Sequence, residues 1–314
     1  MLKSRRRFLL GASAVAAAVL LKPWSRFDLF PAPADAAGAM SEQTRLMMGT
    51  LVSVRTRPGA GTAAAEAVRA AFAEAARLEA LLTRHESAAP LGVLNRQGTI
   101  RDVPPELRQV LSAAARVAKT TDHAFNPLAA TLVEARRQGA GDDDLKRLEP
   151  LIGPDGLRTD GAGLTLNAPE LVCSLDGIAK GFIVDAMSRV LRERGVRDHL
   201  INAGGDIFAC GGPDDGRPWT VGILGPEGRI ARVVSLRDRA LATSGNAESM
   251  ARGYEHIARA RNADPTAPRP FSASAAATNA TLADAYATAL FAMDPVRAER
   301  AAERVGVELT LVKA

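Results

Sequence analysis

A polar loop that leads into a helix is the segment of this chain best suited to bind an anion. The segment covers residues 174–185, and its helix is predicted to begin near Ala179. Gly177 and Gly181 would let the backbone approach a ligand closely, while the first helical amides point their hydrogens at it. Lys180 adds a full positive charge at the same place. A solvated turn before an amphipathic helix would explain the same spacing, so both interpretations stay open.

An acidic and a hydroxyl side chain four residues apart suggest a site for a hard metal ion. Asp284 and Thr288 lie on one predicted helix, and positions i and i+4 project from the same helix face. Mg²⁺ takes oxygen ligands and commonly uses one or two carboxylates, completing its shell with water and substrate phosphates. This sparse pair therefore suits Mg²⁺ better than Ca²⁺ or Zn²⁺. A capping or surface role is the alternative for any single pair of this kind.

Two glycine-containing turns offer further polar groups. Asn202-Ala-Gly-Gly-Asp206 separates two apolar runs, which predicts the turn of a β-hairpin. Thr243-Ser-Gly-Asn246 predicts a hydroxyl-rich turn after a strand at 240–242. Either turn could donate to or accept from a ligand. Either could equally be structural, since Asp, Asn and Ser side chains commonly satisfy backbone amides in turns.

Other common catalytic patterns are missing from the sequence. His85, His123, His199 and His256 show no metal-ligand spacing, and there is no Cys-x-x-Cys. The sequence also lacks Gly-x-Ser-x-Gly and has no Gly-x-Gly-x-x-Gly after a strand. It therefore indicates neither a zinc site, nor a serine-hydrolase nucleophile, nor a dinucleotide-binding fingerprint.

The hydrophobic patterns predict the helices and strands that must position these residues. Alternation over 44–57 predicts a strand interrupted at Gly49, and short apolar runs between glycines predict a sheet-forming half at 157–241. Predicted helices cover 63–84, 104–121, 127–138, 179–194, 282–293 and 295–305, before a last strand at 307–312. Helices and strands are partly segregated, so an α+β fold with mixed sheets and packed helices is favoured over a doubly wound sheet.

The N-terminus has the pattern of an export signal. Ser4-Arg-Arg-Arg-Phe-Leu9 is followed by an uncharged apolar run that ends at Leu21. That run is too short to span a bilayer stably, and Ala34-Asp-Ala36 offers a small-residue cleavage site. We expect a twin-arginine signal peptide at 1–36, a linker at 37–43 and a periplasmic domain at 44–314 without stable membrane insertion.

Removal of residues 1–36 would change the charge balance. The chain of 314 residues has a formal net charge of +5, and the remaining segment has +1. A nearly neutral protein gives no case for nucleic-acid binding. The remaining length suits one large domain or two intimately packed lobes. Cys173 and Cys210 are the two cysteines, and the sequence leaves open whether they pair.

Short motifs occur along the chain in one particular order. They are Met48-Gly-Thr50, Leu94-Asn95, Phe125-Asn-Pro127, Gly177-Ile-Ala-Lys-Gly181, Asn202-Ala-Gly-Gly-Asp206, Trp219-Thr-Val-Gly-Ile223, Thr243-Ser-Gly245, His256-Ile257 and Ala283-Asp-Ala-Tyr-Ala-Thr-Ala289. In this order the chain resembles the ApbE family of FAD:protein FMN transferases from about residue 44 to residue 312. The whole series in register is far more specific than any one motif.

The resemblance implies a Mg²⁺-dependent transferase whose substrate is FAD. Such an enzyme transfers the FMN half of FAD to a threonine or serine hydroxyl of an exported protein and releases AMP. By the same resemblance, the Gly177 carbonyl, Asp284 and Thr288 would hold the metal. Lys180 would contact the FAD phosphates, and His256 would act as the general base.

The resemblance also implies the rest of the nucleotide site. Met48 matches a flavin-site residue, and Phe125, Asn126 and Pro127 match a segment that lines the nucleotide pocket. Further FAD contacts are expected from His85, Ser174, Asp176, Gly204, Gly205, Asp206, Thr243, Ser244, Gly245 and Ile257. The expected partner is an acceptor flavoprotein, such as a membrane electron-transfer component of nitrous oxide reduction.

Several residues depart from the family pattern. Ser174 stands where the family commonly has aspartate, and Asp176 appears two positions later. Asn246 replaces a common aspartate, and His256-Ile-Ala-Arg-Ala260 replaces His-Ile-Ile-Asp-Pro. These changes leave two alternatives to transfer. One is hydrolysis of FAD to FMN and AMP, and the other is FAD binding without turnover.

Overall fold

The computed structural model describes residues 40–57, 61–161, 163–214, 216–250, 253–264 and 266–313. These residues belong to one compact unit, Met40–Ala314. The predicted signal peptide at 1–36 lies outside the described residues. In the described part, no helix is both long and apolar enough to cross a membrane.

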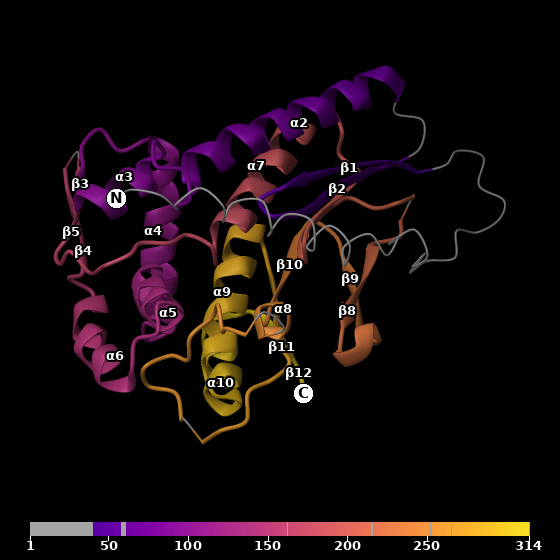
Figure 1. The fold of residues 1–314 in the computed structure, drawn as a ribbon. Helices are drawn as coiled ribbons and strands as arrows, with labels where there is room; N and C mark the ends of the chain where they lie inside the picture. The colour runs from indigo at the N-terminus through magenta and orange to yellow at the C-terminus, as the bar shows by residue number, and fades with distance from the viewer. Residues whose placement is uncertain are drawn as a thin grey trace, which may run out of the picture. The chain divides into compact units, whose positions relative to one another are not determined.

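A seven-stranded antiparallel sheet forms the centre of this unit (Figure 1). Its strands, in spatial order, are β1 Ser41–Met47, β2 Thr50–Thr56, β6 His199–Ala203, β7 Asp206–Cys210, β10 Arg239–Ser244, β11 Ser272–Ala277 and β12 Glu308–Val312. Strands far apart in the sequence are neighbours, since β2 pairs with β6 and β7 pairs with β10. The sheet thereby brings the loops of separate segments together at its ends.

Two tight turns lie side by side at one end of the sheet. Met48 and Gly49 connect β1 to β2 with φ values of 52° and 71°, as a type I′ hairpin turn requires. Gly204 and Gly205 connect β6 to β7 with φ values of 65° and 102°. A Cβ atom on Gly204 would lie 2.5 Å from the Thr50 hydroxyl oxygen, so this turn needs glycine where it meets the other.

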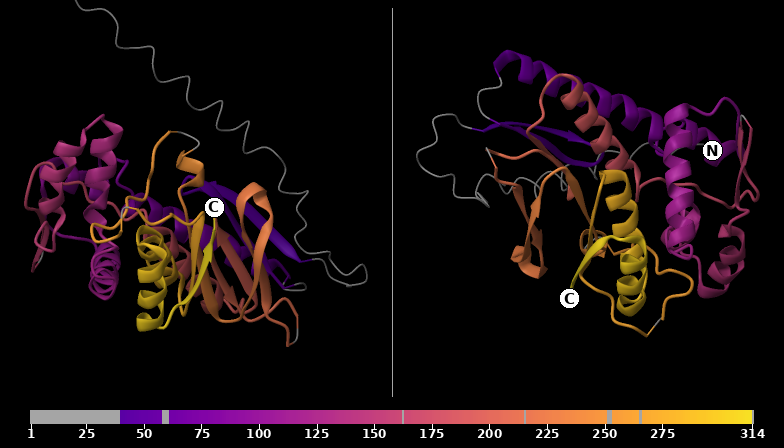
Figure 2. Two further views of the ribbon diagram at one scale, coloured as in Figure 1. Left: turned by 90° about the horizontal axis from the view of Figure 1, so that it is seen from below. Right: turned by 180° about the vertical axis from the view of Figure 1, so that it is seen from behind.

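Within the described residues, four helices cover one face of the sheet (Figures 1 and 2). They are α2 Gly61–Leu82, α7 Ala179–Glu193, α9 Ala280–Ala292 and α10 Pro295–Val305. Phe72, Ile183 and Leu290 from these helices share one core with Val54 and Ile201 of the strands. α9 is rich in alanine and mostly buried, because it packs on β10 and β11 of the sheet and against α7.

A hairpin packs on the opposite face of the sheet. Its strands are β8 Trp219–Leu224 and β9 Ile230–Leu236. Ile223 and Leu236 of the hairpin pack against Leu200 and Leu241 of the sheet in a second, smaller core. Both faces of the sheet are therefore covered, which accounts for its many alanine and β-branched residues.

A mostly helical part lies beside the sheet. It contains α3 Pro90–Gln97, α4 Pro105–Thr120, α5 Ala130–Arg137 and α6 Asp142–Leu148, with a small sheet of β3 Thr99–Ile100, β5 Gly163–Leu166 and β4 Leu157–Asp160. Two short 3₁₀ turns, Pro127–Ala129 and Glu149–Ile152, join these elements.

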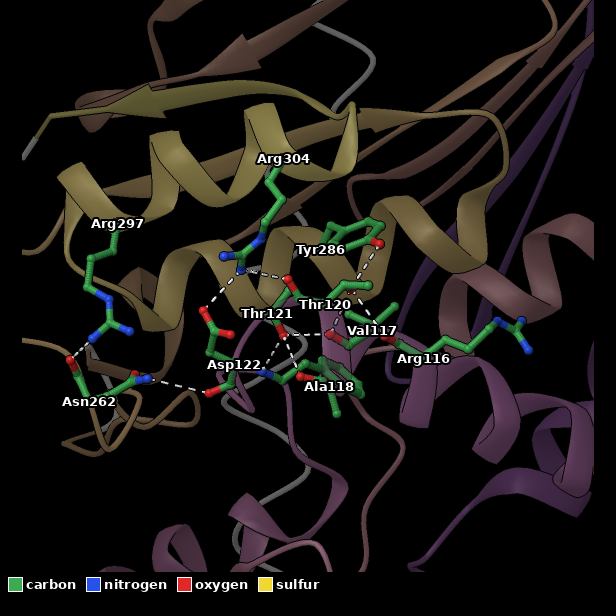
Figure 3. Close-up of polar contacts among 11 residues, drawn as sticks. Arg116, Val117, Ala118, Thr120, Thr121, Asp122, Asn262, Tyr286, Arg297 and Arg304 are labelled. Carbon is green, nitrogen blue, oxygen red and sulfur yellow. Dashed lines mark hydrogen bonds and ion pairs between the residues drawn. The ribbon is translucent and has the colours of Figure 1, made fainter.

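The carboxyl end of α4 is tied to α9 and α10 (Figure 3). Arg304 donates to the Thr120 carbonyl at 2.8 Å and to the Asp122 carboxylate at 3.0 Å. The Tyr286 hydroxyl lies 3.2 Å from the Thr120 hydroxyl. A cation at the last carbonyls of a helix is favourable because it opposes the helix dipole. These contacts fix the helical part against the helices that cover the sheet.

The α+β prediction is confirmed, and the helices predicted at 63–84, 104–121, 179–194, 282–293 and 295–305 are present with small shifts at their ends. The predicted helix at 127–138 begins as a 3₁₀ turn. Two corrections concern boundaries. β1 begins at Ser41, so 41–43 belong to the sheet and not to a linker. Thr243 and Ser244 belong to β10 and not to a turn. The sequence did not predict α3 or α6.

Candidate functional site

A loop over residues 174–178 leads into α7, as the sequence predicted. The Ser174 amide donates to the Pro127 carbonyl at 2.8 Å, and the Ser174 hydroxyl accepts from the Asp176 amide at 3.1 Å. The serine thus closes a local turn of the kind that hydroxyl side chains commonly make. Ile178 at the N-cap offers no side-chain acceptor to the first amides of α7.

The α7 N-terminus meets α9 at very short range because two glycines lie between them. A Cβ atom on Gly181 would lie 2.1 Å from the Ala280 carbonyl oxygen. One on Gly177 would lie 2.9 Å from the Thr288 hydroxyl oxygen. Both glycines therefore allow close helix packing, and the predicted approach of a ligand is not needed to explain them.

Asp284 caps this helix N-terminus from the neighbouring helix. Its Oδ2 accepts from the Gly181 amide at 3.0 Å. α7 returns the contact, because Asp185 accepts from the amides of Ala280 at 2.8 Å and Thr281 at 2.9 Å. The reciprocal caps fix the register of the two helices. They therefore fix where Asp284 lies relative to the loop before α7.

Lys180 and two buried carboxylates form a charge cluster at this junction. Lys180 donates to Asp206, the first residue of β7, whose side chain is only 2% exposed. Asp284 is 3% exposed. Burial alone would lower the pKa of Lys180, but the charges of Asp206 and Asp284 outweigh it and raise this pKa. Burial and the Asp206 charge raise the pKa of Asp284 to about 8.

The oxygen atoms around Asp284 have the chemistry of a Mg²⁺ site. Thr288 lies one turn further along α9, and its hydroxyl is 3.5 Å from the Gly177 carbonyl oxygen and 3.2 Å from the Ser244 hydroxyl. A carboxylate, a hydroxyl and a carbonyl are hard oxygen donors. The raised pKa of Asp284 shows that its negative charge lacks full compensation, and a cation beside it would supply this. The three predicted metal ligands therefore fit the ion, and the structure brings them together.

The turn between β6 and β7 and the end of β10 contribute the neighbouring polar groups. The Gly205 amide donates to the Asn202 side-chain oxygen at 2.9 Å, and Thr243 of β10 is the side chain that a Cβ atom on Gly205 would meet, at 4.0 Å. The Thr243 hydroxyl lies 2.7 Å from the Ser274 hydroxyl. Gly245 has no room for a side chain, since a Cβ atom would lie 2.8 Å from the Phe271 carbonyl oxygen.

His256 lies on an exposed segment that is anchored beside the end of β10. Its Nδ1 is 2.8 Å from the Ser249 hydroxyl. The Asn246 side chain accepts from the Ile257 amide and donates to the Ile257 carbonyl, both at 3.0 Å. Arg269 also donates to this carbonyl at 2.9 Å. An aspartate at 246 could accept from the amide but could not donate to the carbonyl, so the asparagine is suited to its place.

The segment at 125–127 braces the loop before α7. Phe125 is buried in the main core. The Asn126 side chain accepts from the Leu128 amide at 2.9 Å and donates to the Ile152 carbonyl at 2.6 Å. Pro127 supplies the carbonyl that accepts from the 174 amide. Both polar groups of the asparagine thus have partners within the protein.

Two of the remaining predicted residues, Met48 and His85, lie near the carboxyl end of α2. Met48 is half-buried in the turn beside the sheet, and its amide donates to Glu79 Oε1 at 2.7 Å. His85 is exposed just after the end of α2, and its amide donates to the Thr83 hydroxyl at 3.2 Å. The contacts of these two residues with a nucleotide stay predictions.

Arg84 is a residue of this region that the sequence did not single out. It contacts Asp176 Oδ2 at 3.1 Å and Glu134 Oε1 at 3.0 Å, and its side chain is 17% exposed. Asp176 is therefore held by an arginine. No local pattern could have revealed these two ion pairs, because the three residues come from distant segments.

Asn95 is a second contact with the loop that sequence reasoning did not explain. Its side chain donates to the Cys173 carbonyl at 2.9 Å and accepts from the Cys173 amide at 2.8 Å. The sequence shows Leu94-Asn95 as a motif, and the fold brings Asn95 to the backbone of Cys173. Cys173 and Cys210 are both buried and free in the described structure.

A family model described as the ApbE family matches residues 48–311. The FAD:protein FMN transferase of Treponema pallidum is 30% identical over 285 residues, which cover 80% of this chain and 78% of the relative. That of Vibrio cholerae is 29% identical over 183 residues, which cover 54% of this chain and 53% of the relative. The chain spans about half the length of the first curated relatives it matches.

Two solved structures have the same fold. The apo form of the flavinyl transferase ApbE from Pseudomonas stutzeri has a TM-score of 0.77 and 24% identity, covering 88% of this chain and 92% of that one. The flavin transferase ApbE from Vibrio cholerae has a TM-score of 0.74 and 23% identity, covering 87% and 93%. At these identities the similarity establishes the fold.

Proposed function

The chain belongs to the ApbE family, and we propose that it transfers the FMN half of FAD to a threonine or serine hydroxyl of an acceptor protein. The observation that carries this proposal is the cluster of Lys180, Asp206 and Asp284 at the N-terminus of α7. A lysine and a helix N-terminus attract phosphate groups, and the oxygen donors beside them suit Mg²⁺.

The reaction is a substitution at phosphorus. The acceptor hydroxyl oxygen bonds to the phosphorus of the FMN phosphate, and the bond from this phosphorus to the AMP phosphate oxygen breaks. AMP leaves with that oxygen, and the hydroxyl proton passes to His256. A neutral imidazole is available as a base near pH 7. The product is a flavin linked to the acceptor by a phosphoester.

Lys180 has the task of stabilising charge on the diphosphate. Its ammonium group has three N–H donors, and the contact with Asp206 leaves others for phosphate oxygens. Asp206 holds the ammonium group in place, because its own side chain is buried at the start of β7. A donor fixed before the substrate arrives needs no reorganisation during the reaction.

Asp284, Thr288 and the Gly177 carbonyl would hold a Mg²⁺ ion in this scheme. The ion would neutralise negative charge on the transferred and leaving phosphates. The close contact of α7 and α9 at two glycines would keep the three donors together.

Two of the departures from the family pattern, Asn246 and Ser174, are compatible with transfer. Asn246 holds the backbone beside His256 by two hydrogen bonds, so this substitution keeps the proposed base in place. Ser174 closes the turn before α7 through its hydroxyl, so this departure keeps the loop in place.

The compartment and partner form a further part of the proposal. The twin-arginine pattern at 1–36 supports export to the periplasm, where the acceptor would be a membrane electron-transfer protein. The net charge of +1 for the remaining chain gives no support for nucleic acid as a partner.

In-gel flavin fluorescence tests the proposal. The protein is incubated with FAD, Mg²⁺ and an acceptor domain, and the acceptor is then separated under denaturing conditions. A fluorescent acceptor band and one AMP for each flavin attached are expected. An acceptor whose target threonine or serine is replaced by alanine is the matched control, and it should stay dark.

Two other results would contradict transfer. Free FMN with AMP and a dark acceptor would show that water attacks the phosphorus, as in an FAD pyrophosphatase. Intact FAD bound to the protein would show a binding role without turnover.

A further inference from the structure

Ser249 is a buried hydroxyl in direct contact with the proposed base, and none of the roles above uses it. It lies on the short helix α8 Ala247–Met250 and is 5% exposed. Its oxygen is 2.8 Å from His256 Nδ1. A buried hydroxyl beside an exposed imidazole can set the position of the imidazole proton.

The other contact of Ser249 favours one direction for this hydrogen bond. The Ser249 hydroxyl donates to the Asn246 carbonyl at 3.0 Å, three residues earlier in the chain. A hydroxyl has one proton, so an oxygen that donates it to a carbonyl can only accept from a second partner. The second partner here is His256 Nδ1, which must then carry a hydrogen.

We infer that Ser249 is a positioning residue that holds neutral His256 in the tautomer with hydrogen on Nδ1. The lone pair of the neutral ring is then on Nε2. The importance of this tautomer for turnover rests on the proposed function, in which His256 accepts the hydroxyl proton. Nε2 is the atom that accepts it.

The charged form of His256 needs no rearrangement of this contact. After Nε2 takes the proton, Nδ1 still carries its hydrogen and still donates to Ser249. The ring therefore keeps one orientation through the step. Fixing a base in its reactive tautomer by a hydrogen bond to the other ring nitrogen follows the logic of catalytic triads, here with a serine as the orienting group.

The backbone beside His256 is held independently of Ser249. Asn246 makes two hydrogen bonds to Ile257, and Arg269 makes a third. Substitution of Ser249 should therefore change the tautomer and leave the position of the segment unchanged.

The ¹⁵N and ¹H NMR spectra of the imidazoles test the inference without turnover. The chain has four histidines, and a His256→Gln variant identifies the signals of His256. At a pH where the ring is neutral, a protonated Nδ1 and an unprotonated Nε2 are expected in the unsubstituted protein. A protonated Nε2 would overturn the inference. The spectra report the tautomer whether or not the protein transfers FMN. Failure of this inference can therefore be distinguished from failure of the proposed function.

Variants at Ser249 separate positioning from a structural role. Ser249→Ala should lose the bias toward Nδ1–H and lower kcat about 5- to 10-fold, the value of one hydrogen bond, with KM for FAD unchanged. Ser249→Thr keeps the hydroxyl, so it should keep the bias toward Nδ1–H and the kcat of the unsubstituted protein. Ser235→Ala, on the exposed strand β9, is the control. An alanine variant that keeps the Nδ1–H tautomer would overturn the role of Ser249.

Discussion

The Asp284 carboxylate accepts a hydrogen bond from the Gly181 amide at 3.0 Å. This contact places a buried carboxyl group at the N-terminus of α7, where the helix dipole favours its charged form. The stabilisation is incomplete, since burial still raises the pKa of Asp284 to about 8. Two residues from different helices thus create a place where a cation would lower the energy of the folded protein.

Asp284→Asn should abolish Mg²⁺-dependent transfer and leave the fold intact. Asparagine keeps an oxygen that accepts from the Gly181 amide, but it lacks the charge that attracts a hard cation. We expect the rate of transfer to fall by about 100-fold or more, and the response of the rate to Mg²⁺ to be lost. The measurement is the rate of acceptor labelling over a Mg²⁺ titration, with circular dichroism to check the fold. Unchanged labelling would contradict the metal assignment.

Lys180→Gln should weaken FAD binding through the phosphates alone. Loss of one charge-assisted hydrogen bond corresponds to a dissociation constant about 10-fold or more higher. Riboflavin has no phosphate, so its affinity should not change. Both affinities can be measured by quenching of flavin fluorescence.

The control for Lys180 addresses Asp206, which the single variant leaves buried without its partner. The double variant with Asp206→Asn removes both charges and keeps a pair of polar side chains. The double variant should bind FAD as weakly as the single Lys180 variant. It should unfold at a higher temperature than the single variant, because no unpaired buried charge remains. An equal loss of riboflavin affinity in either variant would show that the lysine supports the fold and not the phosphates.

Local patterns made much of the scaffold predictable. The turn at 204–205 carries glycines between apolar runs, a pattern typical of a hairpin. The helix at 179–193 follows from its apolar period. These features depend on neighbours in the sequence, so the sequence was sufficient. The prediction at 44–57 was only partly right, because one interrupted strand was expected where the structure has two antiparallel strands joined at Met48 and Gly49.

The missed features depend on partners that are far apart in the chain. Gly181 was interpreted as room for a ligand, whereas its contact is the Ala280 carbonyl of another helix. Asp185 caps α9 from a distance of 95 residues in the sequence. Ser249 carries no motif, and its importance follows from the position of His256. Such pairings arise from tertiary packing, which local propensity does not encode.

Gly181→Ala should destabilise the protein by forcing α7 away from α9. The added Cβ atom would lie 2.1 Å from the Ala280 carbonyl oxygen, which belongs to backbone and cannot rotate away. Overpacking of this kind costs about 1–3 kcal/mol. Urea unfolding measures the loss. Gly222→Ala is the control, because its Cβ would meet Ile230 at an ordinary distance of 3.4 Å. Equal stability of the two variants would contradict this packing.

The protein should lose stability in acid because His199 is buried in its neutral form. It is fully buried, and its ring contacts the Ser188 hydroxyl at 2.9 Å and the Val196 carbonyl at 3.0 Å. Burial lowers the pKa of His199 to about 4. Below its ordinary pKa near 6.5 the unfolded chain binds a proton that the folded chain excludes, so stability falls between pH 6.5 and 4. The contribution reaches about 3 kcal/mol.

His199→Gln should remove this part of the pH dependence. The measurement is the free energy of unfolding by urea at pH 7.5 and at lower pH, for the variant and the unsubstituted protein. His123→Asn, at an exposed histidine, should leave the slope as it is. An unchanged slope in the His199 variant would show that other groups cause the acid sensitivity.

Arg84→Gln should loosen the loop before α7 and weaken FAD binding about 3- to 10-fold, the value of about 1 kcal/mol. Arg84 joins Asp176 of the loop to Glu134 of α5. Asp176 is mostly exposed, so this half of the pair contributes little by itself. The Glu134 side chain is 21% exposed and would lose its partner. The link between α5 and the loop at 174–178 would then be broken. Hydrogen exchange should therefore become faster at the amides of 174–178.

Arg77→Gln is the matched control for Arg84. Arg77 also joins two carboxylates, those of Glu74 in α2 and Glu106 in α4, but neither partner lies in the loop at 174–178. It should change neither FAD affinity nor hydrogen exchange at 174–178. Restoration of slow exchange by Arg84→Lys would show that charge is sufficient to hold Asp176. Failure of lysine would show that the fork of the guanidinium is needed, because one ammonium group cannot meet both carboxylates with the same geometry. Slow exchange in the glutamine variant would show that Ser174 and Asn95 hold the loop without the arginine.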